Sequence, residues 1–326
     1  MKILVTGSSG HLGEALVRVL RTAEHQITGI DILPSDFTDQ VGSIEDRSLV
    51  KQCVKGVDAI LHGATLHKPH VVTHTHQDFV DVNISGILNL LEEAVAAGVR
   101  AFIYTSTTST FGDALTPRVH APAAWITEDT KPIPKNIYGV TKTAAEDLCQ
   151  LFYRNYRLPC LVLKTSRFFL EADDNQALRE TYDDANIKAN EFLNRRVDIE
   201  DVVSAHMLAM EKAASIGFAR YIISATTPFT KDDSVDLQSD APLVLKRRVP
   251  DYEEIYASMG WKMFSGISRV YDNQRAKMEL GWQPKYDFQH ILDSSKAGKD
   301  YRSQLSLQVG TKGYHTKTFK DGPYPV

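Results

Sequence analysis

Short apolar runs alternate with stretches of helical periodicity through the first half of the chain, and this alternation constrains the fold more than any other feature. The apolar runs cover residues 2–6, 26–31, 59–62, 101–105 and 159–164, and the helical stretches cover residues 11–22, 44–55, 79–97 and 138–156. Strands that alternate with helices in this way build βαβ units and a parallel sheet. The sequence therefore predicts an α/β fold with a doubly wound parallel sheet.

The regularity weakens after residue 165 and returns near residue 196. Residues 171–175 and 183–186 are polar and acidic, so we expect loops outside the sheet there. A helix at 200–214 and a strand at 220–224 restore the α/β pattern, and a proline- and charge-rich third follows. We predict a sheet domain of residues 1–168 and 196–228. A smaller, discontinuous C-terminal lobe would contain residues 169–195 and 229–326, and its last dozen residues would form an extended tail.

Composition and charge favour a small-molecule partner. A net charge of -4 and a charged fraction of 24% give no electrostatic reason to expect nucleic acid or an acidic membrane as partner. The chain begins with a strand-like run, without a signal segment, and no apolar run approaches the roughly 18 residues of a membrane span. Its three cysteines are odd in number and lie in apolar or helical contexts, which favours a reducing compartment. We therefore expect a cytoplasmic protein.

A glycine-rich turn separates the first strand from the first helix. Gly7 would permit the tight turn, Gly10 the close approach of phosphates to the backbone, and Gly13 the packing of the helix on the strand. The turn also contains Ser9, His11 and Leu12. A helix N-terminus and free backbone N–H groups favour a pyrophosphate, so we predict a Rossmann-type dinucleotide site. A glycine-rich turn without a ligand is the alternative.

Asp31 ends the second predicted strand, 18 positions after Gly13. A carboxylate at this place can accept hydrogen bonds from the adenosine ribose hydroxyls. The next four residues, 32–35, include no arginine or lysine that would hold a 2′-phosphate. NAD is therefore favoured over NADP, and a capping or turn aspartate is the alternative.

Tyr138 and Lys142 are separated by four positions and would lie on one face of a helix. A free tyrosine has a pKa of about 10, and a nearby ammonium favours the phenolate, which makes tyrosine a usable base. The same lysine could hold the nicotinamide ribose. An exposed surface pair is the alternative. With the glycine turn and Asp31, the pair predicts proton transfer coupled to hydride transfer.

These motifs together resemble the extended, or atypical, short-chain dehydrogenase/reductase superfamily, in particular its NAD-dependent epimerase/dehydratase family. The resemblance covers most of the chain and rests on Gly7, Gly10, Gly13, Asp31, His62-Gly-Ala-Thr65, Val82-Asn83, the Ser/Thr run before Phe111-Gly112, Tyr138, Lys142, Arg196-Val-Asp-Ile-Glu-Asp201 with Ala205-His206, and Leu280-Gly-Trp-Gln-Pro284.

The resemblance implies an enzyme with NAD bound in the Rossmann domain and substrate bound in the smaller lobe. Cofactor contacts carried over from the family are Ser43, Ile44, Gly63, Ala64, Thr65, Asn83 and Thr105, besides the turn residues, Asp31, Tyr138 and Lys142. Counting five residues back from Gly112 gives Thr107 as the third catalytic residue, which would orient the substrate oxygen. A β-branched strand end is the alternative interpretation of this run. Thr108, Arg167 and Phe168 would border the substrate.

The chain departs from the family in its substrate region. Relatives that bind nucleotide-linked sugars usually have an asparagine where this chain has Leu170, and the segment before Arg196 is acidic. A nucleotide-linked substrate is therefore in question. Five histidines between His62 and His76 form another unusual feature. His67 and Lys68 could touch a polar or anionic substrate; solvated loop histidines and a metal site are the alternatives, and the spacing matches no standard zinc pattern.

We therefore expect an NAD-dependent enzyme that acts at a secondary alcohol carbon of a sugar or sugar derivative, foremost an epimerase. The alternative is a simple NAD-dependent dehydrogenase or carbonyl reductase on a free sugar, sugar acid or polyol. A non-catalytic NAD-sensing protein is a third hypothesis. Two long helices, at 79–97 and 138–156, carry second apolar stripes that include Leu148, Leu151 and Phe152, and family members pair these helices, so we expect a homodimer.

Overall fold

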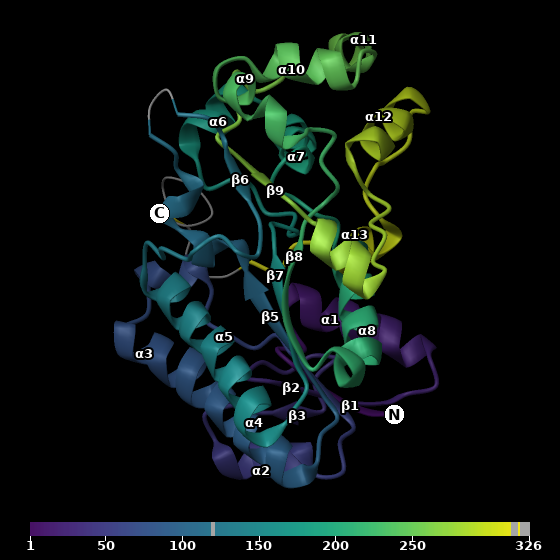
Figure 1. Cartoon of the computed structure of the whole chain (residues 1–326). Coiled ribbons are helices and arrows are strands. Elements are labelled where there is room, and N and C mark those ends of the chain that lie inside the picture. Colours follow the sequence, from purple (N-terminus) through teal and green to yellow (C-terminus); the bar gives the residue numbers. More distant parts are fainter. Residues whose placement is uncertain (119–120, 314–318, 320–326) are drawn as a thin grey trace.

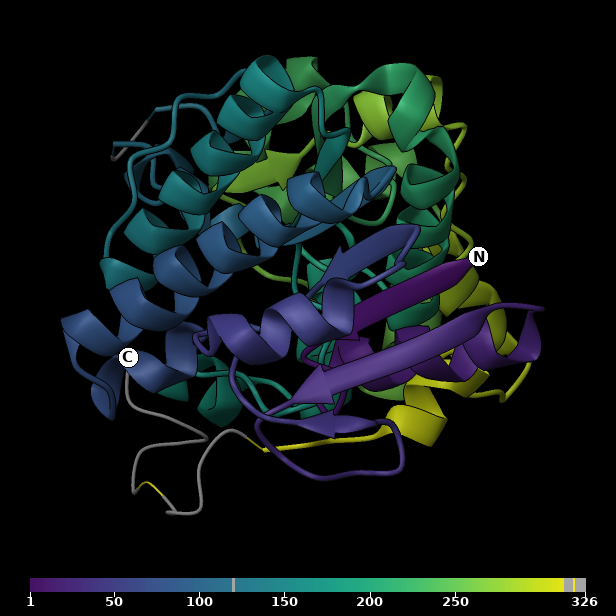
Figure 2. The same cartoon turned by 90° about the horizontal axis from the view of Figure 1, so that it is seen from below.

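A seven-stranded parallel sheet forms the centre of the molecule (Figure 1). The computed structural model describes residues 1–118, 121–313 and 319. The strand order is β3-β2-β1-β4-β5-β7-β8. The strands are β1 (Lys2–Thr6), β2 (Gln26–Asp31), β3 (Gln40–Val41), β4 (Ala59–His62), β5 (Ala101–Thr107), β7 (Cys160–Thr165) and β8 (Phe218–Ile223). The predicted doubly wound sheet is confirmed, and Figure 2 shows β1 inside it, with a strand on each side.

Helices cover both faces of this sheet. The longer helices of the sheet domain are α1 (His11–Thr22), α2 (Arg47–Val54), α4 (Gly86–Ala97), α5 (Ile137–Tyr156) and α8 (Ile199–Ile216), and α3 (His76–Val80) precedes a π-helical turn at Asp81–Ser85 that leads into α4. The remaining helices are α6 (Gln176–Thr181), α7 (Asp184–Phe192), α9 (Ser234–Ser239), α10 (Ala241–Arg248), α11 (Tyr252–Met259), α12 (Phe288–Lys296) and α13 (Gln304–Val309).

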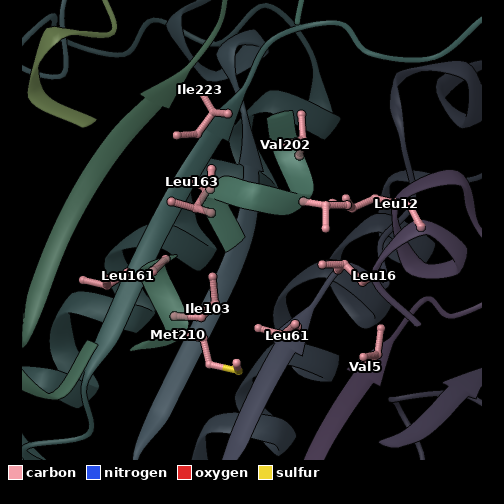
Figure 3. Close-up of a cluster of buried hydrophobic side chains, with 14 of the residues drawn as sticks. Val5, Leu12, Leu16, Leu61, Ile103, Leu161, Leu163, Val202, Met210 and Ile223 are labelled. Atoms are coloured by element: carbon pink, nitrogen blue, oxygen red, sulfur yellow. The ribbon is translucent and has the colours of Figure 1, made fainter. Parts of the chain in front are cut away.

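Successive side chains of a strand point to opposite faces of the sheet and pack into two separate hydrophobic cores. Along β1, Ile3 and Val5 pack with α1 and α8, whereas Leu4 packs with α2, α4 and α5. Figure 3 shows the first core, in which Leu12 and Leu16 of α1 face Val5 of the sheet. This period of two is the pleat of a strand that is buried on both faces. It explains why the strands read as continuous apolar runs in the sequence.

The predicted elements agree closely with the structure, with one local exception. Residues 171–175 are loop as expected, whereas residues 184–186 of the second stretch begin α7, and α6 lies between the two stretches. Asn175 caps α6 by accepting a hydrogen bond from the Leu178 N–H, and Ile187 and Phe192 of α7 are buried. The prediction of a loop at 183–186 was wrong because tertiary burial stabilises α7 in a segment with little periodic apolar content. The extended tail predicted for the last dozen residues lies, apart from Phe319, outside the described residues.

A two-stranded parallel sheet lies beyond the carboxyl ends of the main strands. It pairs β6 (Ala124–Ile126) with β9 (Arg269–Tyr271). In Figure 1 these strands and α9 to α12 stand above the main sheet. A separate hydrophobic cluster holds them together, and Leu237, Val244 and Phe288 are among its buried members. The segment that contains β6 therefore packs with elements that follow it by more than 100 residues.

Within the described residues, no helix is both long and apolar enough to cross a membrane. The longest, α5, has 20 residues and carries Lys142, Glu146 and Asp147. Its residue Phe152 is buried in the sheet core, so it does not belong to the second apolar stripe predicted for this helix. Val140 and Leu151 on the same helix are exposed.

Candidate active site

A cavity of about 800 Å³ opens at the carboxyl ends of the strands, around the point where the strand order reverses between β1 and β4. Ligands of doubly wound sheets bind at such a switch point. Every residue assigned to cofactor or substrate from the sequence lines this cavity, with the exception of Asn83. The topology thus brings together residues that lie more than 150 positions apart, from the first glycine to Phe168.

The glycine turn is shaped as the sequence predicts. Gly7 has a φ of 76°, a value that favours glycine, and its N–H donates to the Ile30 carbonyl at 2.9 Å. A Cβ atom on Gly13 would stand 1.9 Å from the Gly7 carbonyl oxygen, so α1 packs directly on the turn. Since Gly10, the N-cap of α1, has no side chain, the first N–H groups of the helix face the cavity without a side-chain cap. This arrangement suits an anion such as a pyrophosphate.

Asp31 stands beside this turn at the end of β2. Its Oδ2 accepts a hydrogen bond from the Ser9 N–H at 3.1 Å, and its Oδ1 accepts one from the Leu33 N–H at 2.9 Å. The carboxylate is therefore held at the cavity wall with its orientation determined. Ser43 and Ile44 line the same end of the cavity, and the Ser43 hydroxyl donates to Glu45 at 2.7 Å.

Asn83 is buried and forms hydrogen bonds with the loop that follows β4. Its amide Nδ2 donates to the Leu66 carbonyl, and its Oδ1 accepts from the Thr65 hydroxyl at 2.8 Å and from the Leu66 N–H at 2.8 Å. It also donates to Thr141 of α5 at 3.1 Å. Among the residues assigned from the sequence, Asn83 is the one that does not line the cavity. Its hydrogen bonds hold in place the loop after β4, which forms part of the cavity wall.

Thr107, Tyr138 and Lys142 converge on the cavity from β5 and α5. Asn136 caps α5 by accepting from the Gly139 N–H at 3.0 Å, which sets Tyr138 in the first turn. The Thr107 side chain is near enough to Tyr138 to act on its pKa. Lys142 is 2% exposed and donates to the Thr105 carbonyl at 2.7 Å, with its Nζ 4.2 Å from the centre of the Tyr104 ring.

The protonation states in this structure differ from the expectation that the lysine favours the phenolate. Burial raises the pKa of Tyr138 to about 12, and the hydrogen bond with Thr107 opposes the shift. Burial also lowers the pKa of Lys142 to about 7, although the Glu146 carboxylate counteracts it. The tyrosine thus carries its proton at neutral pH because burial disfavours the phenolate, and Lys142 is directed to a carbonyl and a ring face. A further positive charge beside the hydroxyl would favour the phenolate.

The histidines after β4 have separate environments. His62 is buried and its Nδ1 lies 2.7 Å from the Thr6 hydroxyl. His67 lines the cavity with its ring 6.2 Å from that of Tyr138, and burial lowers the pKa of His67 to about 3, so it is neutral. His70 accepts from the His67 N–H at 2.8 Å. Lys68 is ion-paired with Asp174 at 2.6 Å. Within the described part of the chain, no three potential ligand side chains converge as a metal site would require.

A charged cluster that the sequence did not reveal lies at the far end of the cavity. Arg195 and Arg269 line the cavity there, next to Arg167. Arg167 and Arg195 both bind Glu191, at 3.2 and 2.8 Å. Two signals could have found these residues: Arg195 directly precedes the Arg196 motif, and Arg269 is the charged first residue of β9, ahead of buried Val270 and Tyr271.

The C-terminal segment closes the other side of the cavity over the glycine turn. Glu171 accepts hydrogen bonds from the Lys312 N–H at 2.9 Å and the Gly313 N–H at 3.2 Å, and it pairs with His11 at 2.8 Å. The Lys312 ammonium forms an ion pair with Glu14 of α1. This contact, which we call the C-terminal clasp, joins the first helix, the loop after β7 and the segment after α13. No local sequence pattern indicates it.

The donor set of the cavity fits a dinucleotide. The uncapped N-terminus of α1 can receive a pyrophosphate, and Asp31 can receive ribose hydroxyls. Lys142 and Tyr138 stand at the opposite side of the cavity, where a nicotinamide ribose would be held. The position of Gly13 leaves no room for a side chain between α1 and the turn, as close binding of phosphates by backbone N–H groups requires.

Similar proteins share both the sequence pattern and the fold. The chain is 33% identical over 153 residues to an uncharacterized protein, y4nG, of Sinorhizobium fredii, which covers 45% of this chain and 36% of that protein. It is 28% identical over 188 residues to an uncharacterized UDP-glucose epimerase, YtcB, of Bacillus subtilis, covering 52% of this chain and 56% of that protein. The chain thus spans about a third to a half of the length of these curated relatives.

The solved structure of a short-chain dehydrogenase/reductase superfamily protein from Agrobacterium tumefaciens with bound NAD has the same fold, with a TM-score of 0.65 and 23% identity over 91% of this chain and 96% of that chain. The model of the NAD dependent epimerase/dehydratase family matches residues 3–223, which include the glycine turn, Asp31, Thr107, Tyr138 and Lys142. The chain belongs to the NAD dependent epimerase/dehydratase family.

Proposed function

We propose that this protein is an NAD-dependent sugar epimerase in which Thr107, Tyr138 and Lys142 form the catalytic site. The observation that carries the proposal is their convergence on one cavity with the glycine turn and Asp31. A proton-transfer group at one end and a dinucleotide site at the other are the two parts that such a reaction needs.

In this proposal Thr107 orients the reacting sugar oxygen and Tyr138 exchanges its proton. Both side chains line one cavity, and Thr107 is near enough to Tyr138 to act on its pKa, which supports a substrate oxygen that meets both. Bound NAD would supply a hydride acceptor and donor at the sugar carbon. Lys142, with a pKa lowered by burial to about 7, would bring a positive charge that depends on pH near neutrality.

The substrate is proposed to be a sugar or sugar derivative with a secondary hydroxyl. Family membership supports this class, and the name of the Bacillus subtilis relative supports epimerisation over net oxidation. The cavity, of about 800 Å³, has the size of a small-molecule binding site, since ligand pockets occupy about 300–1,000 Å³. We propose that residues 169–195 and 229–326, together with β6, form the substrate lobe.

The test combines two measurements on the same samples. The protein is incubated with NAD and a panel of UDP-sugars and free sugars, product stereochemistry is followed by NMR, and NADH is followed by absorbance. We expect the epimer to form without accumulation of NADH. NADH that grows in proportion to the oxidised product would overturn the epimerase and identify a dehydrogenase. Binding of NAD without turnover of any sugar would favour the non-catalytic hypothesis.

A pair of tyrosine variants on one helix tests the catalytic assignment. Tyr138→Phe removes the hydroxyl in the cavity and should lower turnover by about 10²- to 10⁴-fold, the usual contribution of a general acid or base. Tyr156→Phe changes an exposed tyrosine near the end of the same helix and should leave turnover unchanged. Equal turnover of the two variants would refute the role of Tyr138.

We further propose that the protein is a cytoplasmic homodimer that pairs α4 and α5 across a two-fold axis. Val140 and Leu151 are 48% and 43% exposed on α5, and half-buried Leu148 lies between them on the same helix. Apolar side chains of this kind favour burial against a second copy. The three cysteines are buried and unpaired, which supports a reducing compartment. A monomer mass by light scattering at micromolar concentration would contradict the dimer.

A further inference from the structure

Among the described residues, Arg269 is a cation of the cavity wall without a counter-charge. It belongs to β9 and lines the cavity. Its Nε–H is buried and has no hydrogen-bond partner in the part of the chain that the structure describes. The guanidinium likewise forms no ion pair within 4.0 Å among those residues. A buried N–H of a charged group without an acceptor is unusual in a folded protein, because desolvation is then uncompensated.

A second guanidinium stands close to it. The positive charge of Arg269 acts to lower the pKa of Arg195, after burial and against the attraction of Glu191. Arg195 also lines the cavity, and its side chain is 21% exposed. Two like charges at one cavity wall repel each other, and an anion between them would relieve the repulsion.

The carboxylates nearby are already occupied. Glu191 is bound by three arginines, at 2.7 to 3.2 Å, Asp174 is bound by Arg167 and Lys68, and Asp173 is ion-paired with Arg167. The cluster contains five cations and three carboxylates: Lys68, Arg167, Arg195, Arg196 and Arg269, and Asp173, Asp174 and Glu191. Two positive charges remain in this set, and Arg269 is its one member that no carboxylate of the described residues neutralises.

These guanidinium groups lie near the candidate reacting groups. Thr107 of β5 is in register with Thr165 of β7, and Arg167, two residues after Thr165, bridges to Arg196. Neighbouring strands are about 4.8 Å apart and each residue advances about 3.3 Å along a strand, so two strand spacings and two residues place the backbone of Arg196 roughly 12 Å from that of Thr107. Arg195 directly precedes Arg196 and lines the same cavity as Thr107. An anionic group on the same sugar ring that meets Thr107 is therefore within reach.

We propose that Arg195 and Arg269 bind a carboxylate carried by the sugar ring itself, so that the substrate belongs to the uronic acid class. The planar fork of a guanidinium matches a carboxylate in two parallel hydrogen bonds. This inference rests on the proposed function for the position of the sugar, but not for the existence of the anion site.

The test uses ligands that differ only in the carboxylate. Binding of UDP-glucuronic acid and UDP-glucose, and of free glucuronate and glucose, is measured by calorimetry on the NAD-loaded protein. We expect the acid of each pair to bind about ten-fold or more tightly, the effect of one or two charge-assisted hydrogen bonds. Arg269→Gln should reduce the difference to about two-fold or less, and Arg247→Gln, at an exposed ion pair on α10, should preserve it.

Three outcomes would overturn the inference. Equal binding of acid and neutral sugar by the wild type would exclude a carboxylate site. A loss of affinity in Arg269→Gln that is the same for both UDP-sugars and absent for the free sugars would mean that the arginine binds the diphosphate. Preference for the acid that persists in Arg269→Gln would place the carboxylate elsewhere. Since calorimetry needs no turnover, failure of the epimerase proposal would leave the binding result interpretable.

Protein stability supplies an independent check on the same variant. Arg269 has no ion pair to lose among the described residues, and its removal relieves repulsion with Arg195. Arg269→Met should therefore unfold at the same temperature as the wild type or a higher one in the absence of sugar. A clear fall in the unfolding temperature would mean that Arg269 has a structural partner, and would overturn the argument that its guanidinium is available to bind a ligand.

Discussion

Gly13→Ala tests whether close packing of α1 on the glycine turn creates the cofactor site. The added Cβ would stand 1.9 Å from the Gly7 carbonyl oxygen and 2.7 Å from the Ser8 Cα, whereas ordinary contacts begin at 3.4 Å. The helix must therefore move by about 1.5 Å relative to the turn. Both obstructing atoms belong to the backbone, so no side chain can rotate away. The shift would also displace Leu12 and Leu16 from the core in Figure 3.

The expected cost follows from overpacking. An extra methyl group in a packed interior costs about 1–3 kcal/mol, and a rigid backbone neighbour favours the upper end, about 3 kcal/mol. The control is Gly98→Ala at the end of α4. Gly98 has a φ of 71°, and its added Cβ would meet no atom within 4 Å. Only the left-handed backbone is then penalised, at about 1 kcal/mol. The two variants should differ by about 2 kcal/mol in the free energy of unfolding.

The assay is urea unfolding with and without NAD. A ligand at 100 times its Kd stabilises a protein by about 2.7 kcal/mol, so NAD should stabilise the wild type and Gly98→Ala alike. Gly13→Ala should lose most of this increment, because its turn no longer presents the N–H groups in the same positions. If both variants lose the same free energy and keep the same NAD increment, the argument from packing is refuted.

The remaining predictions concern pH and the C-terminal clasp. Burial lowers the pKa of three histidines to between about 3 and 4, far below the value of about 6.5 in an unfolded chain: His62, His67 and His206. The unfolded state then binds more protons than the folded state below about pH 6.5. Lowering the pH from about 7 to about 5 should therefore reduce the free energy of unfolding by up to about 1.4 kcal/mol per pH unit for each histidine, and the urea midpoint should fall with it. Asp201, whose pKa burial raises to about 7, opposes this trend; midpoints that rise on acidification would contradict the prediction. Glu171→Gln should weaken the clasp and speed hydrogen exchange at the N–H groups of residues 312 and 313 about ten-fold, and unchanged exchange would show that the carboxylate charge is unimportant.

Local patterns predicted the elements because each pattern has a local physical cause. The period of the apolar residues separates buried strands from amphipathic helices; position 7 needs glycine for its positive φ, and position 13 needs it for lack of space. The segment containing α6 and α7 was not recognised, because its helices depend on a cap and on burial against distant residues. Asn83 was assigned to the cofactor from the resemblance, whereas its hydrogen bonds go to the loop after β4, at Thr65 and Leu66.

The amino-acid sequence was sufficient for the sheet, the glycine turn and the candidate catalytic residues, since these depend on spacing within single βα units. The charge environment was decided by tertiary structure alone. The uncompensated Arg269, the clasp between Lys312 and His11, and the raised pKa of Tyr138 arise between residues that are distant along the chain. Desolvation and Coulomb interactions depend on burial and on distance in space, and no one-dimensional pattern contains either quantity.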